Sequence, residues 1–140
     1  MDKPVPNVQS ITLQNKISDS SKLFDFLTQY ARTFKIPDET YNDLRLVLEE
    51  TFVNIASYAY EKDDTQTISV ELKSTADEIS ITFTDTGIAF NPLTKSTSCM
   101  ETNDHCEGGM GIHIIKSLSD HQEYNRAGQS NVFTVTKHYT

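Results

Sequence analysis

The sequence predicts an α/β fold in two layers, with helices packed on one face of a mixed, mostly antiparallel β-sheet. Two observations support this prediction. Residues 67–72 and 78–83 alternate apolar and polar side chains, which is typical of strands with one buried and one wet face. Residues 23–34 and 44–59 instead repeat their apolar side chains at helical spacing, so each segment offers an apolar stripe that can cover the sheet.

The chain is expected to form a single domain over residues 1–140. Its 140 residues are enough to bury a core without disulfides or metal. The net charge of −8 argues against binding to a nucleic-acid backbone or to an anionic membrane surface. No apolar run approaches the ~20 residues that span a bilayer, and the first residues lack the apolar core of a signal peptide. These features favour a cytoplasmic protein.

The first third of the chain predicts a tail, a strand and a helix. Residues 1–7 read as a flexible tail, and residues 8–14 alternate as a strand that we expect at a sheet edge. Helical spacing begins near Ser18 and should end near Lys35, because Pro37 disfavours helical geometry at the residue before it. The N-cap candidates of this helix are Ser18, Asp19, Ser20 and Ser21.

A long helix follows, capped by Asp38 and extending to about residue 60. Glu50 and Asn54 lie four residues apart, so both side chains project from the same face of this helix. Taken alone, such a pair is more often a solvated helix face than a site. The apolar stripe on another side consists of Leu44, Leu48, Thr51, Ile55 and Ala59.

The second half of the chain predicts a hairpin, a lid, a short helix and two further strands. The hairpin turns at residues 75–77, and its second strand runs into an Asp85-x-Gly87 turn. Residues 93–107 have no periodicity and are too polar to pack; a loop of this length is either a functional lid or a plain surface connection. The final strands, residues 122–126 and 131–138, flank a turn at 127–130.

A run of glycines, Gly108-Gly109-Met110-Gly111, is expected to form a turn that leads into a helix over residues 112–118. Glycines permit close approach of the backbone to a ligand, and the N–H groups of a helix start attract anions. A single Gly-x-Gly is more often an ordinary turn. Cys99, Cys106 and His105 match structural zinc spacing poorly, and a cytosolic setting disfavours a disulfide.

Three motifs in series carry a resemblance: Glu50-x-x-x-Asn54, Asp85-x-Gly87 and Gly109-Met110-Gly111. The chain resembles the GHKL superfamily of ATP-binding domains, which have the Bergerat fold. More narrowly, it is similar to the bacterial anti-sigma-factor serine/threonine kinases. The narrower resemblance also draws on Phe90-Asn91-Pro92 and on the ending 131–137.

The resemblance implies roles for single residues. Glu50 matches the general base, Asn54 the ligand of Mg²⁺, and Asp85 the acceptor of the adenine amino group, beside the turn that Gly87 permits. Residues 93–107 correspond to an ATP lid. The residues implied in ATP binding are Asn54, Asp85, Gly87, Ala89, Phe90, Lys95, Gly108, Gly109, Met110, Gly111 and Ile112.

The sequence departs from the family pattern in three places. Ala89 stands where the family often has a second glycine, and Tyr58 stands where it has a histidine. In the lid, Lys95 is the only cation, against Glu101, Asp104 and Glu107.

The function that the resemblance implies is that of an ATP- and Mg²⁺-dependent kinase. It would hold a sigma factor inactive and phosphorylate a STAS-type anti-sigma-factor antagonist, and it could form a homodimer. The alternative is a nucleotide-gated partner-switching module that moves no phosphate. A sensor histidine kinase is disfavoured, because all four histidines follow the central helix. A structural domain without ligand would require all three motifs to be coincidence.

Overall fold

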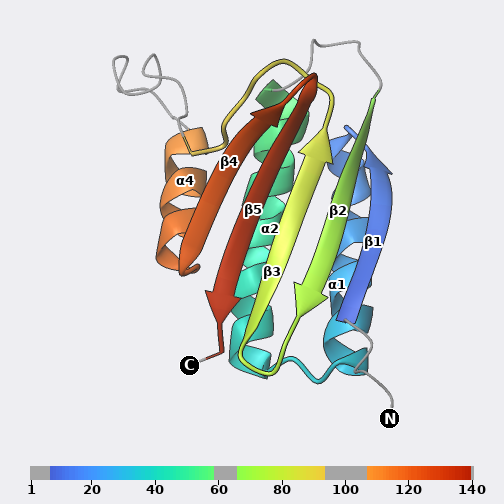
Figure 1. Cartoon of the computed structure of the whole chain (residues 1–140), viewed down its shortest axis with the longest axis vertical. Helices are drawn as coiled ribbons and strands as arrows, with labels where there is room; N and C mark the ends of the chain where they lie inside the picture. The colour runs from blue at the N-terminus through green and yellow to red at the C-terminus, as the bar shows by residue number, and fades with distance from the viewer. Residues whose placement is uncertain (1–6, 59–65, 94–106, 140) are drawn as a thin grey trace.

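A computed structural model describes residues 7–58, 66–93 and 107–139, and Figure 1 shows their arrangement. In chain order the elements are β1 (Asn7–Gln14), the 3₁₀ turn η1 (Ile17–Asp19), α1 (Ser20–Thr33), α2 (Asp38–Tyr58), β2 (Thr67–Ser74), β3 (Glu78–Asp85), α4 (Glu107–Ser117), β4 (His121–Ala127) and β5 (Ser130–His138). β1 thus begins at Asn7, which the sequence placed in the tail.

The two-layer architecture is confirmed. The five strands form one sheet in the order β1-β2-β3-β5-β4, and the helices cover one of its faces (Figure 1). The expected edge position of β1 is also confirmed. The sheet is not mixed, however, because all four pairings among the described strands are antiparallel. Two successive helices separate β1 from β2, and the chain therefore enters β2 in the direction opposite to β1. In the sheet, β5 lies between β3 and β4.

The core lies between the sheet and the central helix α2. Every second side chain of β2 and β3 is buried, as the alternation predicted. The stripe on α2 is buried at its described positions from Leu44 to Ile55, and Ala59 lies outside the described residues. Val47 and Phe52 are buried as well, so α2 is covered over a wider face than the sequence indicated.

α1 ends as predicted but begins differently. Lys35 adopts a left-handed conformation with φ of 56°, and the Ile36 N–H donates to the carbonyl of Ala31 over 3.0 Å. This geometry closes the helix just before Pro37. At the other end, Asp19 occupies the N-cap position without capping the helix. Its carboxylate instead accepts the backbone N–H of Gln14, at 2.9 Å, so it stabilises the turn after β1.

The glycine run is helical, which corrects the predicted turn. α4 begins at Glu107 and therefore includes Gly108, Gly109 and Gly111. Glycine disfavours a helix by only about 1 kcal/mol per residue, and packing against α2 outweighs that cost. The predicted helix start at residue 112 was thus five residues late.

The start of α2 also differs from the prediction. This helix begins at Asp38 itself, directly after Pro37, so Asp38 is a helical residue and not the N-cap.

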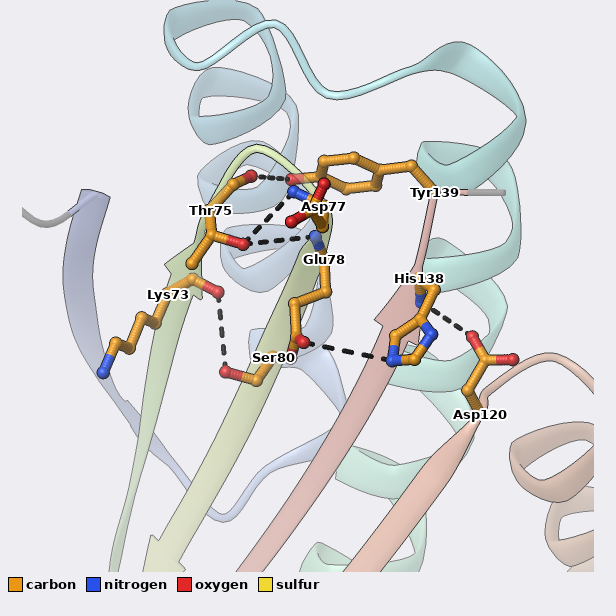
Figure 2. A network of polar contacts seen from close by, with 8 residues as sticks. All are labelled: Lys73, Thr75, Asp77, Glu78, Ser80, Asp120, His138 and Tyr139. Carbon is orange, nitrogen blue, oxygen red and sulfur yellow. Dashed lines mark hydrogen bonds and ion pairs between the residues drawn. The ribbon is translucent and has the colours of Figure 1, made fainter.

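The end of the sheet where β5 finishes is fastened by a network of polar contacts (Figure 2). Tyr139 donates its N–H to the carbonyl of Asp77, at 3.0 Å, and its hydroxyl to the carbonyl of Thr75, at 3.1 Å. The His138 N–H donates to Asp120 Oδ2 over 2.7 Å. These bonds tie the end of β5 to the turn between β2 and β3 and to the segment before β4. Within the described residues, no helix is long and apolar enough to cross a membrane.

Candidate functional site

The first part of the candidate site is the pair that α2 carries, Glu50 and Asn54. Glu50 is half-buried, and Asn54 is 3% exposed. The Asn54 Nδ2 is buried and has no hydrogen-bond partner among the described residues. Buried amides are normally paired, so this group fits a place that takes a ligand. Rotation of the amide by half a turn would present its oxygen there instead.

The second part is Gly111, where α4 packs against this pair. Gly111 is buried, and a Cβ atom on it would lie 2.7 Å from Glu50 Oε2 and 3.3 Å from Asn54 Nδ2. The first distance is shorter than real Cβ contacts, so only glycine fits this position without displacing Glu50. Two of the three predicted motifs are thus in contact.

The first turn of α4 provides backbone donors beside the pair. Gly108, Gly109 and Met110 all lie in this turn, ahead of Gly111. The first N–H groups of a helix have no partner within the helix, and they carry the positive end of its dipole. Such a helix start can bind phosphate oxygens. Ile112 follows in the same helix and is half-buried.

The third part is the turn at the end of β3, which begins at Asp85. Asp85 is 3% exposed and continues the inward phase of its strand. Its Oδ1 accepts the N–H of Gly87 over 2.8 Å, which closes the predicted Asp-x-Gly turn. Beyond this turn, Ile88 is 62% exposed and Ala89 is exposed, whereas Phe90 packs against the core.

All three parts lie at the same end of the molecule, the upper one in Figure 1. This end contains the last turn of α2, the first turn of α4 and the tip of β3. Lys95 lies outside the described residues, as do 94–106 of the predicted lid. At its borders, Leu93 packs against the core and Glu107 belongs to α4. Leu93 and Glu107 therefore do not belong to a loop of the kind predicted at 93–107, and the residues between them stay a prediction. Cys99, His105 and Cys106 also lie outside the described part of the chain.

Sequence reasoning missed three polar residues around Asp85. Asn131 on β5 donates from Nδ2 to Asp85 Oδ1 over 2.9 Å. Tyr124 and Arg126 on β4 both donate to Asn131 Oδ1. A signal for Asn131 was present in the sequence, because this polar residue stands in phase with the apolar Phe133 and Val135 of the same strand. Tyr124 and Arg126 gave no such signal.

The sequence matches the histidine kinase-like ATPase domain family over residues 13–137. The anti-sigma F factor of Clostridium perfringens is 28% identical over 87 residues, which cover 61% of this chain and 62% of that protein. The serine/threonine-protein kinase BtrW of Bordetella bronchiseptica is 29% identical over 98 residues, covering 68% of each chain.

A solved structure shows the same fold. The RsbU and RsbW domains of a Mycobacterium tuberculosis protein superpose with a TM-score of 0.63 at 13% identity, covering 93% of this chain and 32% of that one. In the sequence comparison, the match spans about three fifths of the length of the anti-sigma F factor. The resemblance drawn from the three motifs is confirmed, and the family implies that the ligand is ATP. Because the match extends over nearly the whole sequence, the chain belongs to the histidine kinase-like ATPase domain family.

Proposed function

We propose that this protein is an anti-sigma-factor serine/threonine kinase, which binds ATP with Mg²⁺ and phosphorylates a STAS-type antagonist of the sigma factor that it holds. The observation that carries the proposal is the contact of Gly111 with Glu50 and Asn54. It puts a carboxylate, a carboxamide and the start of α4 in one place. The names of the relatives, an anti-sigma factor and a serine/threonine kinase, support the same class.

Each part of the site has a task in this reaction. Asp85 would accept a hydrogen bond from the adenine amino group, and the first turn of α4 would bind phosphate oxygens. Glu50 would take the proton of the acceptor hydroxyl. The hydroxyl oxygen would bond to the γ-phosphorus of ATP while the bond between that phosphorus and ADP breaks. Mg²⁺ would be held by the Asn54 carboxamide oxygen with phosphate oxygens and waters, and it would neutralise charge on the phosphates.

The donor set suits a hard ion of this kind. Mg²⁺ prefers oxygen ligands and keeps waters and phosphate oxygens around it, and the Asn54 carboxamide can supply one further oxygen. No group of three or more His, Cys, Asp or Glu side chains among the described residues could hold a metal alone. Any magnesium here would therefore depend on the nucleotide, and binding of the two should be mutually dependent.

The test is phosphoryl transfer from labelled ATP to a candidate antagonist. Glu50→Gln keeps the shape of the side chain but removes the base, so we expect a loss of about 10²–10⁴-fold in transfer rate with ATP affinity retained. Glu49→Gln is the matched control, because Glu49 is a half-buried neighbour on the same helix that does not face Gly111. An undiminished rate in Glu50→Gln would contradict the assignment.

A nucleotide-gated binding module is the second candidate. The composition of the predicted lid favours it, because residues 93–107 contain one lysine, Lys95, and three acidic residues, which gives little charge stabilisation to a transferring phosphate. In that case no label would reach the antagonist, and the nucleotide-dependent exchange of sigma factor for antagonist would be the same in wild type and Glu50→Gln. A pull-down of both partners with ADP or ATP separates the two functions.

A further inference from the structure

One side chain holds the Asp85 turn together, and it comes from a different strand. Asn131 lies at the start of β5 directly opposite Asp85 in the β3–β5 register. It is 2% exposed, although it is an amide in a position where β5 otherwise buries apolar residues. A buried amide at this place needs several polar partners, and the turn supplies them.

The amide of Asn131 uses its full hydrogen-bonding capacity within the protein. Nδ2 donates to Asp85 Oδ1, at 2.9 Å, and to the carbonyl of Ile88, at 2.7 Å. An asparagine has two N–H donors, so both are engaged. Asn131 thus bridges the first residue of the turn and a residue three positions later.

The oxygen of the same amide is fixed by three donors. Asn131 Oδ1 accepts the N–H of Phe90 over 3.1 Å, the guanidinium of Arg126 over 3.1 Å, and the hydroxyl of Tyr124. A backbone N–H and a guanidinium can only donate, so the oxygen must face them and the NH₂ group must face Asp85. Arg126 also donates to the carbonyl of Gly87, at 2.8 Å, which ties the turn to β4.

This network determines how Asp85 presents its carboxylate. Oδ1 accepts two hydrogen bonds, from Gly87 and from Asn131, and both come from within the protein. Two charge-assisted bonds of this kind restrict rotation of the carboxylate, so they fix the position of Oδ2 as well. Oδ2 accepts none of the hydrogen bonds that connect Asp85 to the other described residues.

We propose that Asn131 is the positioning residue for purine selection: it locks Asp85 so that Oδ2 accepts the hydrogen bond of a 6-amino group. Asn131 has no donor left for the base and therefore acts through Asp85. The inference rests on the proposed function, since it requires a nucleotide at Asp85. Its consequence is a preference for adenine over a purine without the amino group, because a fixed acceptor left unpaired is costly.

The experiment compares the affinities of ATP and purine riboside triphosphate, which lacks only the 6-amino group, by calorimetry with Mg²⁺. Wild type should prefer ATP. In Asn131→Ala we expect ATP affinity to fall about tenfold and the ratio of the two affinities to approach one, since Asp85 is no longer held. Partial loss of structure would lower both affinities alike and leave the ratio unchanged, so the ratio separates positioning from stability.

The matched control is Asn125→Ala, the same substitution at an exposed position of the neighbouring strand β4. It should leave both affinities unchanged. If Asn131→Ala does not fold, Tyr124→Phe decides, because it removes one donor to Asn131 and keeps the ring; it should lower the ratio by a smaller factor. An unchanged ratio in the folded variant overturns the role of Asn131. Absence of ATP binding by wild type overturns the proposed function itself.

Discussion

At the scale of single residues, the site depends on an approach that only glycine permits. Gly111 brings the backbone of α4 against Glu50 and Asn54 on α2, with no room for a methyl group beside the carboxylate. The carboxylate is the end of a flexible side chain, so it can move away from an added atom. Any such movement displaces the residue that we propose as the base.

Gly111→Ala should therefore separate stability from activity. Gly111 is helical and is not among the residues with positive φ, so alanine gains up to about 1 kcal/mol of helix propensity. Displacement of Glu50 offsets part of that gain, and we expect the free energy of unfolding to change by less than about 1 kcal/mol. Phosphoryl transfer should fall at least about tenfold, because small misplacements of a reacting group are costly.

Urea unfolding and the transfer assay measure the two effects of this substitution. His113→Ala, at an exposed position two residues further along α4, is the control and should leave transfer intact. A Gly111→Ala variant with normal transfer would mean that Glu50 does not need its present position.

Residue-scale chemistry was only partly readable from the sequence. Glu50, Asn54 and Gly111 could be assigned from spacing and resemblance, and they meet in space. Asn131 could not, because its role is set by its partner across the sheet, and the register of β3 against β5 is a tertiary property. A polar residue at a position that alternation predicts to be buried indicates a hydrogen-bond partner, but the alternation does not identify that partner.

At the scale of elements, a single hydroxyl joins one helix to two strands. Tyr30 on α1 is completely buried, and its hydroxyl lies 2.6 Å from Ser74 Oγ on β2 and also contacts the carbonyl of Asn7 on β1. Burial raises the pKa of Tyr30 above its usual value, an effect that the hydrogen bonds to Ser74 only partly offset. Burial likewise raises the pKa of Tyr139, whose hydroxyl bonds Thr75 after β2.

These shifts predict a loss of stability in alkali. The folded state keeps both phenols protonated at a pH where the unfolded chain already ionises them. Their contribution is therefore complete below the unfolded pKa of about 10 and is lost as the pH rises through the higher folded pKa. Tyr30→Phe should lower the free energy of unfolding by about 1 kcal/mol at neutral pH, because a hydrogen bond is lost. It should also make the fall of that free energy in alkali shallower.

Urea unfolding curves between about pH 8 and pH 11 test this prediction. Tyr139→Phe should flatten the decline further when it is combined with Tyr30→Phe. If the single variant declines as steeply as wild type, ionisation of Tyr30 does not govern alkaline unfolding.

The elements themselves were predictable where a periodic pattern matched the final environment. β2, β3 and α2 each have one face in the core, and alternation or helical spacing located them. The predicted start of α4 is too late, because three glycines within four residues look like a turn, whereas contact with α2 keeps them helical. The purely antiparallel sheet depends on how two helices reverse the chain, which no local pattern records.

At the scale of the whole molecule, charge sets how the nucleotide must be bound. The chain has a net charge of −8, and a polyphosphate approaching it adds more negative charge. The proposed phosphate contacts are the backbone at the start of α4 and a magnesium ion held at Asn54, not a cluster of lysines and arginines. Charge neutralisation should then come mainly from the ion.

The salt dependence of ATP binding should reveal this arrangement. With Mg²⁺ in excess, ATP should raise the Tm by several degrees, since about 2.7 kcal/mol of stabilisation is expected at a hundred times Kd. Without Mg²⁺ the shift should be much smaller, and added KCl should increase it, because salt screens the repulsion between the chain and the free nucleotide. Sites built from basic side chains respond in the opposite direction, with affinity that falls as salt rises.

Thermal unfolding with ATP in EDTA, at about 0.05 and about 0.3 M KCl, distinguishes the two cases, because the Debye length falls by about half over this range. Adenosine in place of ATP is the control for the purine end, and its effect should not depend on salt. A Mg²⁺-free shift that shrinks as KCl is added would show that cationic side chains bind the phosphates. The assignment of Asn54 as the magnesium ligand would then lose its main physical reason.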